Sequence, residues 1–129
     1  MGWTTSDLID LTGRRVVVTG ANTGLGAAAA TALASRGADV TLAVRTPQRA
    51  EGVLADIQRS GGHARIEQLD LASLDSIRAF ASRIDGPIDL LLNNAGVMAP
   101  RQHGRTVDGF ETQFGTNHLG HFALTGLLM

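Results

Sequence analysis

The segment VVVTGANTGLG, from Val16 to Gly26, decides how this chain is expected to fold. Its valines predict a buried strand, and the glycines that follow lead into an alanine-rich run with helical character. Glycines permit a tight turn and let a phosphate approach the backbone, while free N–H groups at the helix start face it. The segment therefore predicts a strand–turn–helix unit that binds a phosphate. Its spacing, G-x3-G-x-G, differs from the commoner G-x-G-x-x-G, so a turn without a ligand is the alternative.

Four short apolar runs alternate along the chain with longer alanine-rich or amphipathic segments. Almost continuously apolar strands are typical of a parallel sheet that helices cover on both faces. The alternating order predicts an α/β fold with a doubly wound parallel sheet, truncated after the fourth strand and the following helix. The expected strands are Arg15–Gly20, Asp39–Val44, Ala64–Leu69 and Ile88–Asn94, and the expected helices run from about Gly24 to Arg36, from Pro47 to before Gly61, from Ser73 to before Gly86, and from beyond Thr106 to the C-terminus.

Turn and capping residues mark the ends of several of these helices. Gly37 suits a left-handed C-terminal cap of the first helix. Thr46 suits an N-cap of the second helix, because Pro47 after it is favoured in a first turn. Ser73 suits the N-cap of the third helix, whose first turn also carries Asp75 at the positive end of the helix dipole.

Composition and charge place the chain among globular proteins and argue against several classes of partner. Its 129 residues suffice for one domain, and 43% of them are hydrophobic. A net charge of −1 gives no electrostatic basis for binding nucleic acid or an anionic membrane. The closing apolar run, Leu124 to Met129, is too short for a membrane span, which needs about 20 residues. The absence of cysteine fits a reducing compartment, and we expect a cytoplasmic location.

Arg45 directly follows the second predicted strand. In a dinucleotide-binding fold, a side chain about 20 residues beyond the glycine turn reads the 2′ position of the ribose. An acid there would accept a hydrogen bond from the hydroxyl of NAD, whereas a guanidinium pairs with a 2′-phosphate. Arg45 therefore predicts a preference for NADP(H) over NAD(H), with a solvated surface arginine as the alternative.

Short polar or small residues also follow the third and fourth predicted strands, as Asp70-Leu71 and as the NNAG segment from Asn93 to Gly96. Carboxyl ends of parallel strands meet at one edge of the sheet, and ligands of open parallel sheets bind there. Ala95 and Gly96 would leave room for a ribose or a nicotinamide, and the two asparagines would supply amide groups. An ordinary turn is the alternative for NNAG, but the coincidence of such features at one edge favours a ligand site.

The segments TGANTGLG, Asp70-Leu71, NNAG and NHLGHF occur in the same order in the short-chain dehydrogenase/reductase family, which this chain resembles from about Leu11 to Met129. The segments AVRT and DGFETQFGTNHLGHFALT look most like its retinol dehydrogenase and WW-domain oxidoreductase branch. The resemblance implies a Rossmann-type NAD(P)-binding domain, of which residues 1–129 form the N-terminal portion. It also implies an NADP-dependent oxidoreductase that interconverts alcohols and carbonyls by hydride transfer, with lipophilic substrates suggested by the branch.

The resemblance implies a role for each matching position. The glycine turn would hold the pyrophosphate, and Asp70 with the Leu71 backbone would border the adenine. Asn93, Ala95 and Gly96 would line the nicotinamide-side ribose. Asn117 matches a helix asparagine that supports a proton-relay water, which is a supporting catalytic role. The residues expected to bind the cofactor are Thr19, Gly20, Asn22, Thr23, Gly24, Leu25, Gly26, Arg45, Asp70, Leu71, Asn93, Asn94, Ala95 and Gly96.

His118 and His121 lie three residues apart on the last predicted helix, a spacing that can place two imidazoles on one metal ion. No third ligand accompanies them, and the family segment NHLGHF accounts for both. We therefore expect no metal site.

The chain contains no tyrosine, and all 11 of its basic residues are arginine, so it has no lysine. In the family that it resembles, a serine and a Tyr-x-x-x-Lys pair beyond the helix of Asn117 perform the acid–base chemistry. We expect the cofactor-binding fragment of a longer enzyme, without dehydrogenase activity of its own. The alternatives are a stand-alone dinucleotide-binding or regulatory module and a non-functional truncated product, and the coding sequence beyond codon 129 would distinguish them.

The last predicted helix and the fourth predicted strand are expected to leave apolar surface uncovered in the isolated chain. In many relatives the helix from about Glu111 onward packs against a partner subunit, so a homo-oligomer through this helix is expected. Without a further strand, the fourth strand would form an unprotected sheet edge. Five large side chains would also lose packing surface, namely Phe122, Leu124, Leu127, Leu128 and Met129. We therefore expect the isolated chain to aggregate or to be partly molten unless a missing half, a partner subunit or the cofactor is present.

Overall fold

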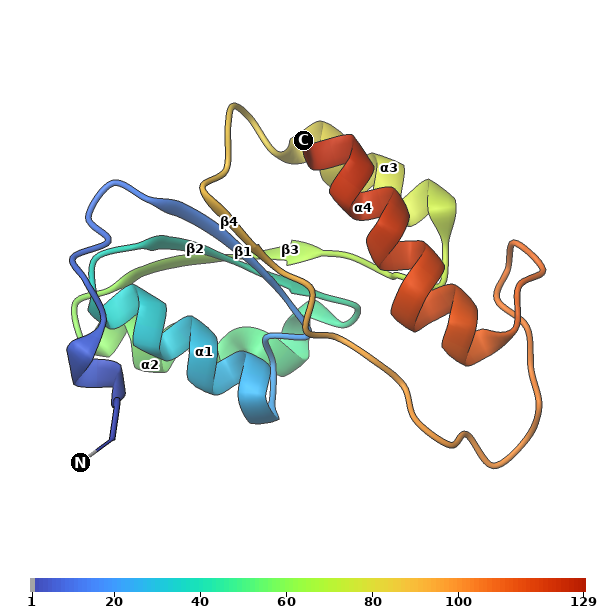
Figure 1. Ribbon diagram of the computed structural model, residues 1–129, viewed down its shortest axis with the longest axis horizontal. Coiled ribbons are helices and arrows are strands. Elements are labelled where there is room, and N and C mark those ends of the chain that lie inside the picture. Colours follow the sequence, from blue (N-terminus) through green and yellow to red (C-terminus); the bar gives the residue numbers. More distant parts are fainter. Residues whose placement is uncertain (1) are drawn as a thin grey trace.

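The computed structural model describes residues 2–129 and contains a four-stranded, fully parallel sheet (Figure 1). The strand order is β3-β2-β1-β4. The chain adds β2 and then β3 on one side of β1, and it then crosses back so that β4 pairs with the other side of β1. This topology confirms the predicted doubly wound parallel sheet. The strands are β1 (Arg15–Thr19), β2 (Asp39–Val44), β3 (His63–Gln68) and β4 (Leu90–Leu92).

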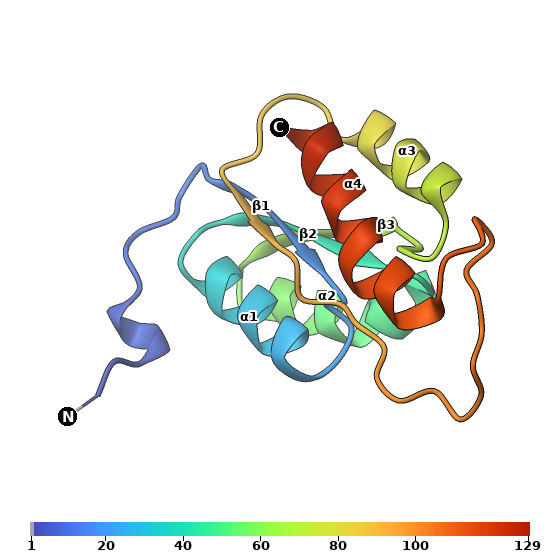
Figure 2. The ribbon, with the colours of Figure 1, turned by 45° about the vertical axis from the view of Figure 1, so that its right-hand side comes forward.

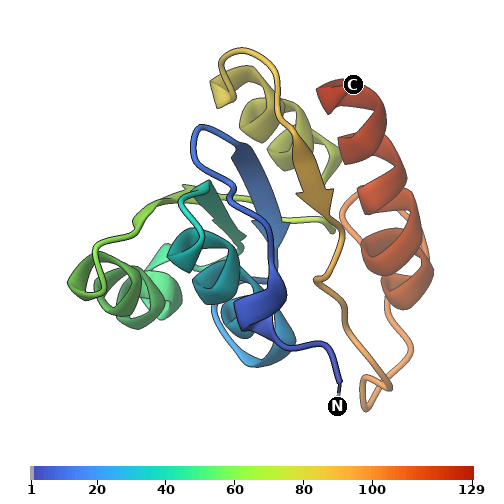
Figure 3. The same ribbon diagram turned by 60° about the vertical axis from the view of Figure 1, so that its left-hand side comes forward.

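Helices cover both faces of the sheet, as Figures 1 and 3 show. Helices α1 (Gly24–Ser35) and α2 (Glu51–Arg59) lie on one face, and α3 (Leu74–Arg83) and α4 (Gly120–Leu128) lie on the other. Alternate residues of β1 serve the two layers, because successive side chains of a strand point to opposite faces. The list of buried residues reflects this: Val16, Val18, Leu42 and Ile57 belong to the core under α1 and α2, whereas Val17, Leu69, Phe80 and Leu124 belong to the core under α3 and α4.

The predicted helix ends are largely confirmed. Gly37 adopts a positive φ of 93°, which is the left-handed backbone conformation expected of the residue that ends α1. The Ser73 hydroxyl accepts a hydrogen bond from the Ser76 backbone N–H at 3.2 Å and caps α3. The predicted N-cap Thr46 is an exception, because its side chain makes no capping hydrogen bond. It precedes a short 3-10 turn, Pro47–Ala50, and α2 follows this turn directly.

The fourth strand is shorter than the predicted range Ile88–Asn94, because its pairing with β1 ends at Leu92. Beyond that residue, the backbone N–H groups of Asn94 and Ala95 donate to the Thr19 hydroxyl instead of to a neighbouring strand. A side chain therefore ends the sheet pairing here. β4 lies at an edge of the sheet, as expected, and Leu90 is partly exposed there.

The last helix begins later than the predicted position just beyond Thr106. A turn at Thr106–Gly109 comes first, closed by a hydrogen bond from the Gly109 N–H to the Thr106 carbonyl. The Glu111 carboxylate then accepts hydrogen bonds from two backbone N–H groups, one of them that of Phe114 at 2.7 Å, and so caps the helix. A π-helical segment, η3 (Phe114–Leu119), leads into α4.

Figure 2 shows the segment between β4 and the last helix as a long loop that leaves the sheet and returns at the base of that helix. Side chains fasten this loop to its surroundings at separate points. The Asp108 carboxylate accepts from the Leu74 N–H at the start of α3, and the Gln113 side chain accepts from the Ala99 N–H. In residues 2–129, no helix combines the length and apolar character that crossing a membrane requires.

Candidate dinucleotide site

A cavity of about 360 Å³ lies at the carboxyl ends of the four strands. The turn after β1, the ends of β2 and β3, the loop after β4 and the first turns of the last helix all contribute to its wall. It lies beside the boundary between β1 and β4, where the strand order reverses and where open α/β sheets bind ligands. The structure thus brings together nine predicted site residues: Gly20, Asn22, Thr23, Arg45, Asp70, Leu71, Asn94, Ala95 and Gly96.

The glycine turn packs directly against the loop after β4. Gly20 has a φ of 64°, and a Cβ at this position would lie 2.8 Å from the Cα of Ala95. A Cβ added at Gly26, in the first turn of α1, would collide with the Gly20 carbonyl and would lie 2.5 Å from the Asn94 side-chain nitrogen. A larger residue at either position would push the turn and the loop apart. This packing therefore requires the glycines, whether or not a phosphate approaches the turn.

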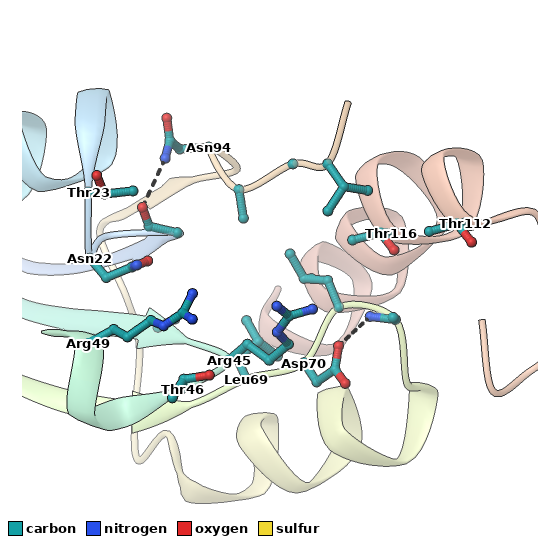
Figure 4. A pocket seen from close by; sticks show the side chains of 17 residues that line it. Asn22, Thr23, Arg45, Thr46, Arg49, Leu69, Asp70, Asn94, Thr112 and Thr116 are labelled. Atoms are coloured by element: carbon teal, nitrogen blue, oxygen red, sulfur yellow. Dashed lines mark hydrogen bonds between the residues drawn. The ribbon is translucent and has the colours of Figure 1, made fainter. Parts of the chain in front are cut away.

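The start of α1 faces the same cavity. Thr23 is the N-cap of α1, yet its side chain makes no capping hydrogen bond, and it lines the cavity beside Asn22 (Figure 4). The first N–H groups of an α-helix have no partner within the helix. These groups, with the positive end of the helix dipole, favour an anion at this end of the cavity.

Arg45, Thr46 and Arg49 lie together on one side of the cavity (Figure 4). Arg45 follows β2 directly, and the 3-10 turn after Pro47 brings Arg49 beside it. Within residues 2–129, neither guanidinium takes part in a salt bridge. Two guanidinium groups and a hydroxyl therefore face a common space, which suits a phosphate group.

Asp70 has its carboxylate partly engaged by its own loop. One carboxylate oxygen accepts from the Ala72 N–H at 2.9 Å, and the Asp70 N–H itself donates to the Ser76 hydroxyl. These bonds fix the turn between β3 and α3, so that Asp70 and Leu71 keep their place on the cavity wall. With Arg45 and Arg49, Asp70 completes the titratable side chains among the described lining residues.

Thr19 is fully buried and supports the site from behind the cavity wall. Its hydroxyl accepts hydrogen bonds from the N–H groups of Asn94 and Ala95, each at 2.9 Å. The Asn94 side-chain amide in turn donates a hydrogen bond of 3.0 Å to the Thr19 backbone carbonyl. Thr19 therefore holds the loop after β4 against the end of β1.

The remaining predicted residues lie outside the cavity lining. The Asn93 amide donates to the Thr125 hydroxyl on α4, and Leu25 is 83% exposed on α1. Asn117 holds the loop after β4 through two hydrogen bonds to the Val97 backbone. Its Oδ1 accepts from the Val97 N–H at 2.8 Å, and its Nδ2 donates to the Val97 carbonyl at 2.7 Å. Gly24, at the first position of α1, and Gly26 shape the turn without lining the cavity.

His118 and His121 occupy different surroundings and do not converge. The exposed His118 ring stacks on Phe114 at a centroid distance of 5.4 Å, whereas His121 is buried against Thr19. Over residues 2–129, no group of three or more histidine and carboxylate side chains has an arrangement that could hold a metal ion.

Sequence reasoning missed several residues of the cavity wall. Arg49 could have been found from its position four residues after Arg45, in a turn marked by Pro47. Thr112 and Thr116 are one helical turn apart, just before Asn117, and both line the cavity (Figure 4). Ala43, Thr46, Leu69, Ala72 and Val97 complete the wall, and only the fold brings these together.

Comparison with known proteins identifies the class to which this fold and site belong. The family model described as short chain dehydrogenase matches residues 14–129, so the chain belongs to that family. The chain is 50% identical to human retinol dehydrogenase 13 over 122 residues, which cover 91% of this chain and 37% of that protein. The chain therefore spans well under half the length of this curated relative.

Two solved structures have the same fold. A crystal structure of an uncharacterized protein from Mycobacterium paratuberculosis matches with a TM-score of 0.91 and 50% identity, over 99% of this chain and 46% of that one. A metagenomic short-chain oxidoreductase in complex with NADP matches with a TM-score of 0.78 and 34% identity, over 92% of this chain and 56% of that one. The four-stranded Rossmann-like unit thus corresponds to about half of each of these structures.

Proposed function

We propose that this chain is the cofactor-binding part of an NADP-dependent oxidoreductase that interconverts alcohols and carbonyl compounds, and that it prefers NADP(H) over NAD(H). The observation that carries the proposal is the group formed by Arg45, Thr46 and Arg49 at the end of β2. A carboxylate at this place would favour the ribose hydroxyl of NAD, whereas two guanidinium groups favour a 2′-phosphate. The relative crystallised with NADP supports the same choice.

The site residues fit an extended dinucleotide. The glycine turn and the start of α1 would hold the pyrophosphate, because backbone N–H groups face that end of the cavity. Asp70 and Leu71 would border the adenine, and Ala95 and Gly96 would leave space for the nicotinamide-side ribose. When bound, the nicotinamide supplies hydride transfer, and the residues of this chain orient the cofactor for it.

Equilibrium titration of the purified chain with NADP and NAD tests the cofactor preference. We expect tighter binding of NADP, and Arg45→Asp should reverse the order by removing a phosphate partner and adding an acceptor for the ribose hydroxyl. Arg49→Gln should weaken NADP and leave NAD unchanged. Arg59→Gln, on the exposed side of α2, is a matched control for lost positive charge. Equal affinities of the wild-type chain for both dinucleotides would contradict the proposal.

The cavity wall supplies binding groups but no tyrosine or lysine for acid–base chemistry. General acid–base groups typically contribute about 10²–10⁴-fold to such reactions. We therefore propose that the 129-residue chain binds NADPH and does not turn it over with aldehydes or ketones. The same observation favours a stand-alone dinucleotide-binding module as the second candidate. Sustained NADPH oxidation by the pure chain would contradict both.

The proposal also covers the substrate class of the complete enzyme and its location in the cell. Because relatives include retinol dehydrogenases, we propose a lipophilic alcohol or carbonyl compound as the substrate of the complete enzyme. The absence of cysteine favours a reducing compartment, and we propose a cytoplasmic location. Activity of the complete enzyme on medium-chain and long-chain aldehydes, compared with short polar ones, tests the substrate class.

The exposed side of the last helix supports a homo-oligomer. Phe114 and Phe122 are 55% and 73% exposed there, and Leu127 is 50% exposed. The His118 ring lies between those of Phe114 and Phe122, and exposed aromatic side chains are enriched at protein contacts. We propose that two copies associate through this face. Light scattering of the wild-type chain should show a dimer, and Phe122→Glu should shift it to the monomer; a monomeric wild-type chain would contradict the proposal.

A further inference from the structure

His121 lies in the core between α4 and the sheet, and its side chain is only 6% exposed. Its Nε2 lies 2.9 Å from the Thr19 hydroxyl, and its Nδ1 lies 2.8 Å from the backbone carbonyl of Asn117. No role in the proposed site follows from its sequence position alone. Both ring nitrogens are nevertheless used, and each contacts a residue that holds the loop after β4.

The Thr19 hydroxyl is surrounded by four possible hydrogen-bond partners. It has one hydrogen to donate and two lone pairs to accept with. The N–H groups of Asn94 and Ala95 occupy the lone pairs, each at 2.9 Å. The remaining partners are the Leu92 carbonyl at 3.3 Å and His121 Nε2 at 2.9 Å. The hydroxyl hydrogen therefore belongs to the shorter contact, with His121 as its acceptor.

The two hydrogen-bond contacts of the imidazole fix the tautomer of His121. A backbone carbonyl only accepts, so Nδ1 must carry the hydrogen that it donates to Asn117. Nε2 is then free to accept from Thr19. The hydrogen bonds all run in one direction, from the Asn94 and Ala95 N–H groups through Thr19 and His121 to the carbonyl of Asn117.

The side chain of Asn117 closes this chain of hydrogen bonds into a ring. It binds both backbone groups of Val97, which lies only two residues beyond Ala95. The loop from Asn94 to Val97 is thus held at one end by Thr19 and at the other by Asn117, and His121 joins the two holders. Gly96 lies between these two points and packs closely against Asn117. A Cβ added at Gly96 would lie 3.3 Å from Asn117 Oδ1.

We propose that His121 is a positioning residue that fixes the loop Asn94–Val97 for the nicotinamide half of a dinucleotide. The inference rests on the proposed function for the ligand, but the hydrogen-bonded ring itself does not. His121 touches no part of the cavity, so it acts only through Thr19 and Asn117. Its loss should therefore affect one half of the ligand and spare the other.

Hydrogen exchange of the ligand-free chain tests the ring directly. We expect His121→Leu to speed exchange at the Asn94, Ala95 and Val97 amides and to leave the paired amides of β2 unchanged. Nitrogen-15 NMR of the wild-type ring should place the hydrogen on Nδ1. Exchange rates unaltered by the substitution, or a hydrogen on Nε2, would overturn the proposal whether or not any dinucleotide binds.

Two substitutions of His121 test its contact with Thr19 separately from its contact with Asn117. Gln at position 121 reaches as far as Nε2 and can accept from Thr19, whereas Asn reaches only as far as Nδ1. We expect His121→Gln to keep the amides of Asn94 and Ala95 protected and His121→Asn to lose that protection. Thr19→Val combined with His121→Leu should expose the Asn94 and Ala95 amides no more than Thr19→Val alone, because His121 supports these amides only through the Thr19 hydroxyl. Additive effects would overturn the link.

Binding of two probes tests the consequence for the ligand. We expect His121→Leu to weaken NADP about tenfold, the size of one lost hydrogen bond, and to leave adenosine 2′,5′-bisphosphate unchanged. His118→Leu, on the exposed side of the same helix, is the matched control. Equal weakening of both probes would show general destabilisation and overturn the positioning role. If the wild-type chain binds neither probe, the proposed function fails, and hydrogen exchange alone decides the ring.

Discussion

The two sides of the cavity are built in different ways. On the β2 side, the ends of regular strands and the start of α1 place the glycine turn and Arg45 mainly through backbone geometry. On the β4 side, the wall is irregular backbone from Asn94 to Val97, held in place by side chains of Thr19 and Asn117. The difference teaches that one side of the site depends on the fold, whereas the other depends on individual hydrogen bonds.

Substitution of the glycine where the two sides touch should have the largest effect. Gly20→Ala adds a Cβ 2.8 Å from Ala95 at a φ of 64°. Backbone strain and overpacking together should lower the free energy of unfolding by roughly 2–4 kcal/mol. Urea denaturation measures the loss. Gly13→Ala is the control, because it has a φ of 80° but no atoms within 4 Å of the added Cβ, and it should show the strain alone.

Removal of the Asn117 side chain should show how far the β4 side depends on one residue. Asn117→Ala deletes both hydrogen bonds to Val97, and we expect a loss of about 1–2 kcal/mol in the free energy of unfolding. Amide exchange should accelerate at Val97 and stay slow in β1. Acceleration in both places would mean that the two sides are not separable. Gln113→Ala, which removes a single bond of 3.2 Å to Ala99, is a smaller version of the same change.

The cap of α3 offers a test on the side of the fold that regular structure builds. Ser73→Ala removes the hydrogen bond from the Ser76 N–H. A lost N-cap typically costs about 1 kcal/mol, and we expect the midpoint of thermal unfolding to fall without a change in dinucleotide affinity. Ser73→Asp keeps an acceptor and should restore stability. A large loss of affinity in Ser73→Ala would contradict the separation of the two sides.

The smallest effect should come from Glu111, at the start of the last helix. Hydrogen bonds from the backbone N–H groups of Phe114 and Gln113 lower the pKa of its carboxyl. A lowered pKa in the folded state means that Glu111 stabilises the fold above about pH 4.3, the ordinary glutamate value, and that this contribution is lost as pH falls through the folded pKa.

Denaturation curves between pH 3 and pH 7 measure the contribution of Glu111. Glu111→Gln should be slightly less stable than the wild type near pH 7 and should match it at pH 3. Glu51→Gln is the control, because Glu51 also lies in the first turn of a helix but has no hydrogen-bond donor within residues 2–129. A gap between Glu111→Gln and the wild type that widens at low pH would reverse the sign and refute the argument.

The sequence was a good guide wherever local chemistry decides the outcome. Gly37 and Ser73 lie at the helix ends that their residue types predict, and β2 has the predicted bounds. The apolar runs predicted the layers, because a strand buried on both faces has few alternatives. Arg45 was found for the same reason, since its place follows from the end of β2.

The rest depends on contacts between residues far apart in the chain. β4 ends early because Thr19, more than 70 residues before it, takes the N–H groups that a strand would use. Asn93 turns toward Thr125, which no local pattern foretells. His121 was considered as a metal ligand from its spacing to His118, and its contact with Thr19 became visible only in the folded chain.

Gly120 joins the last helix to the opposite end of the cavity. A side chain at this position would collide with the carbonyl of Leu71, so the helix backbone rests directly on the turn after β3. No flexible side chain lies between them to absorb movement. A displacement of α4, such as that caused by docking of another subunit on its outer face, has to move Leu71 as well. Mechanical stiffness at one glycine thus makes the Leu71 end of the cavity sensitive to events on the far side of the helix.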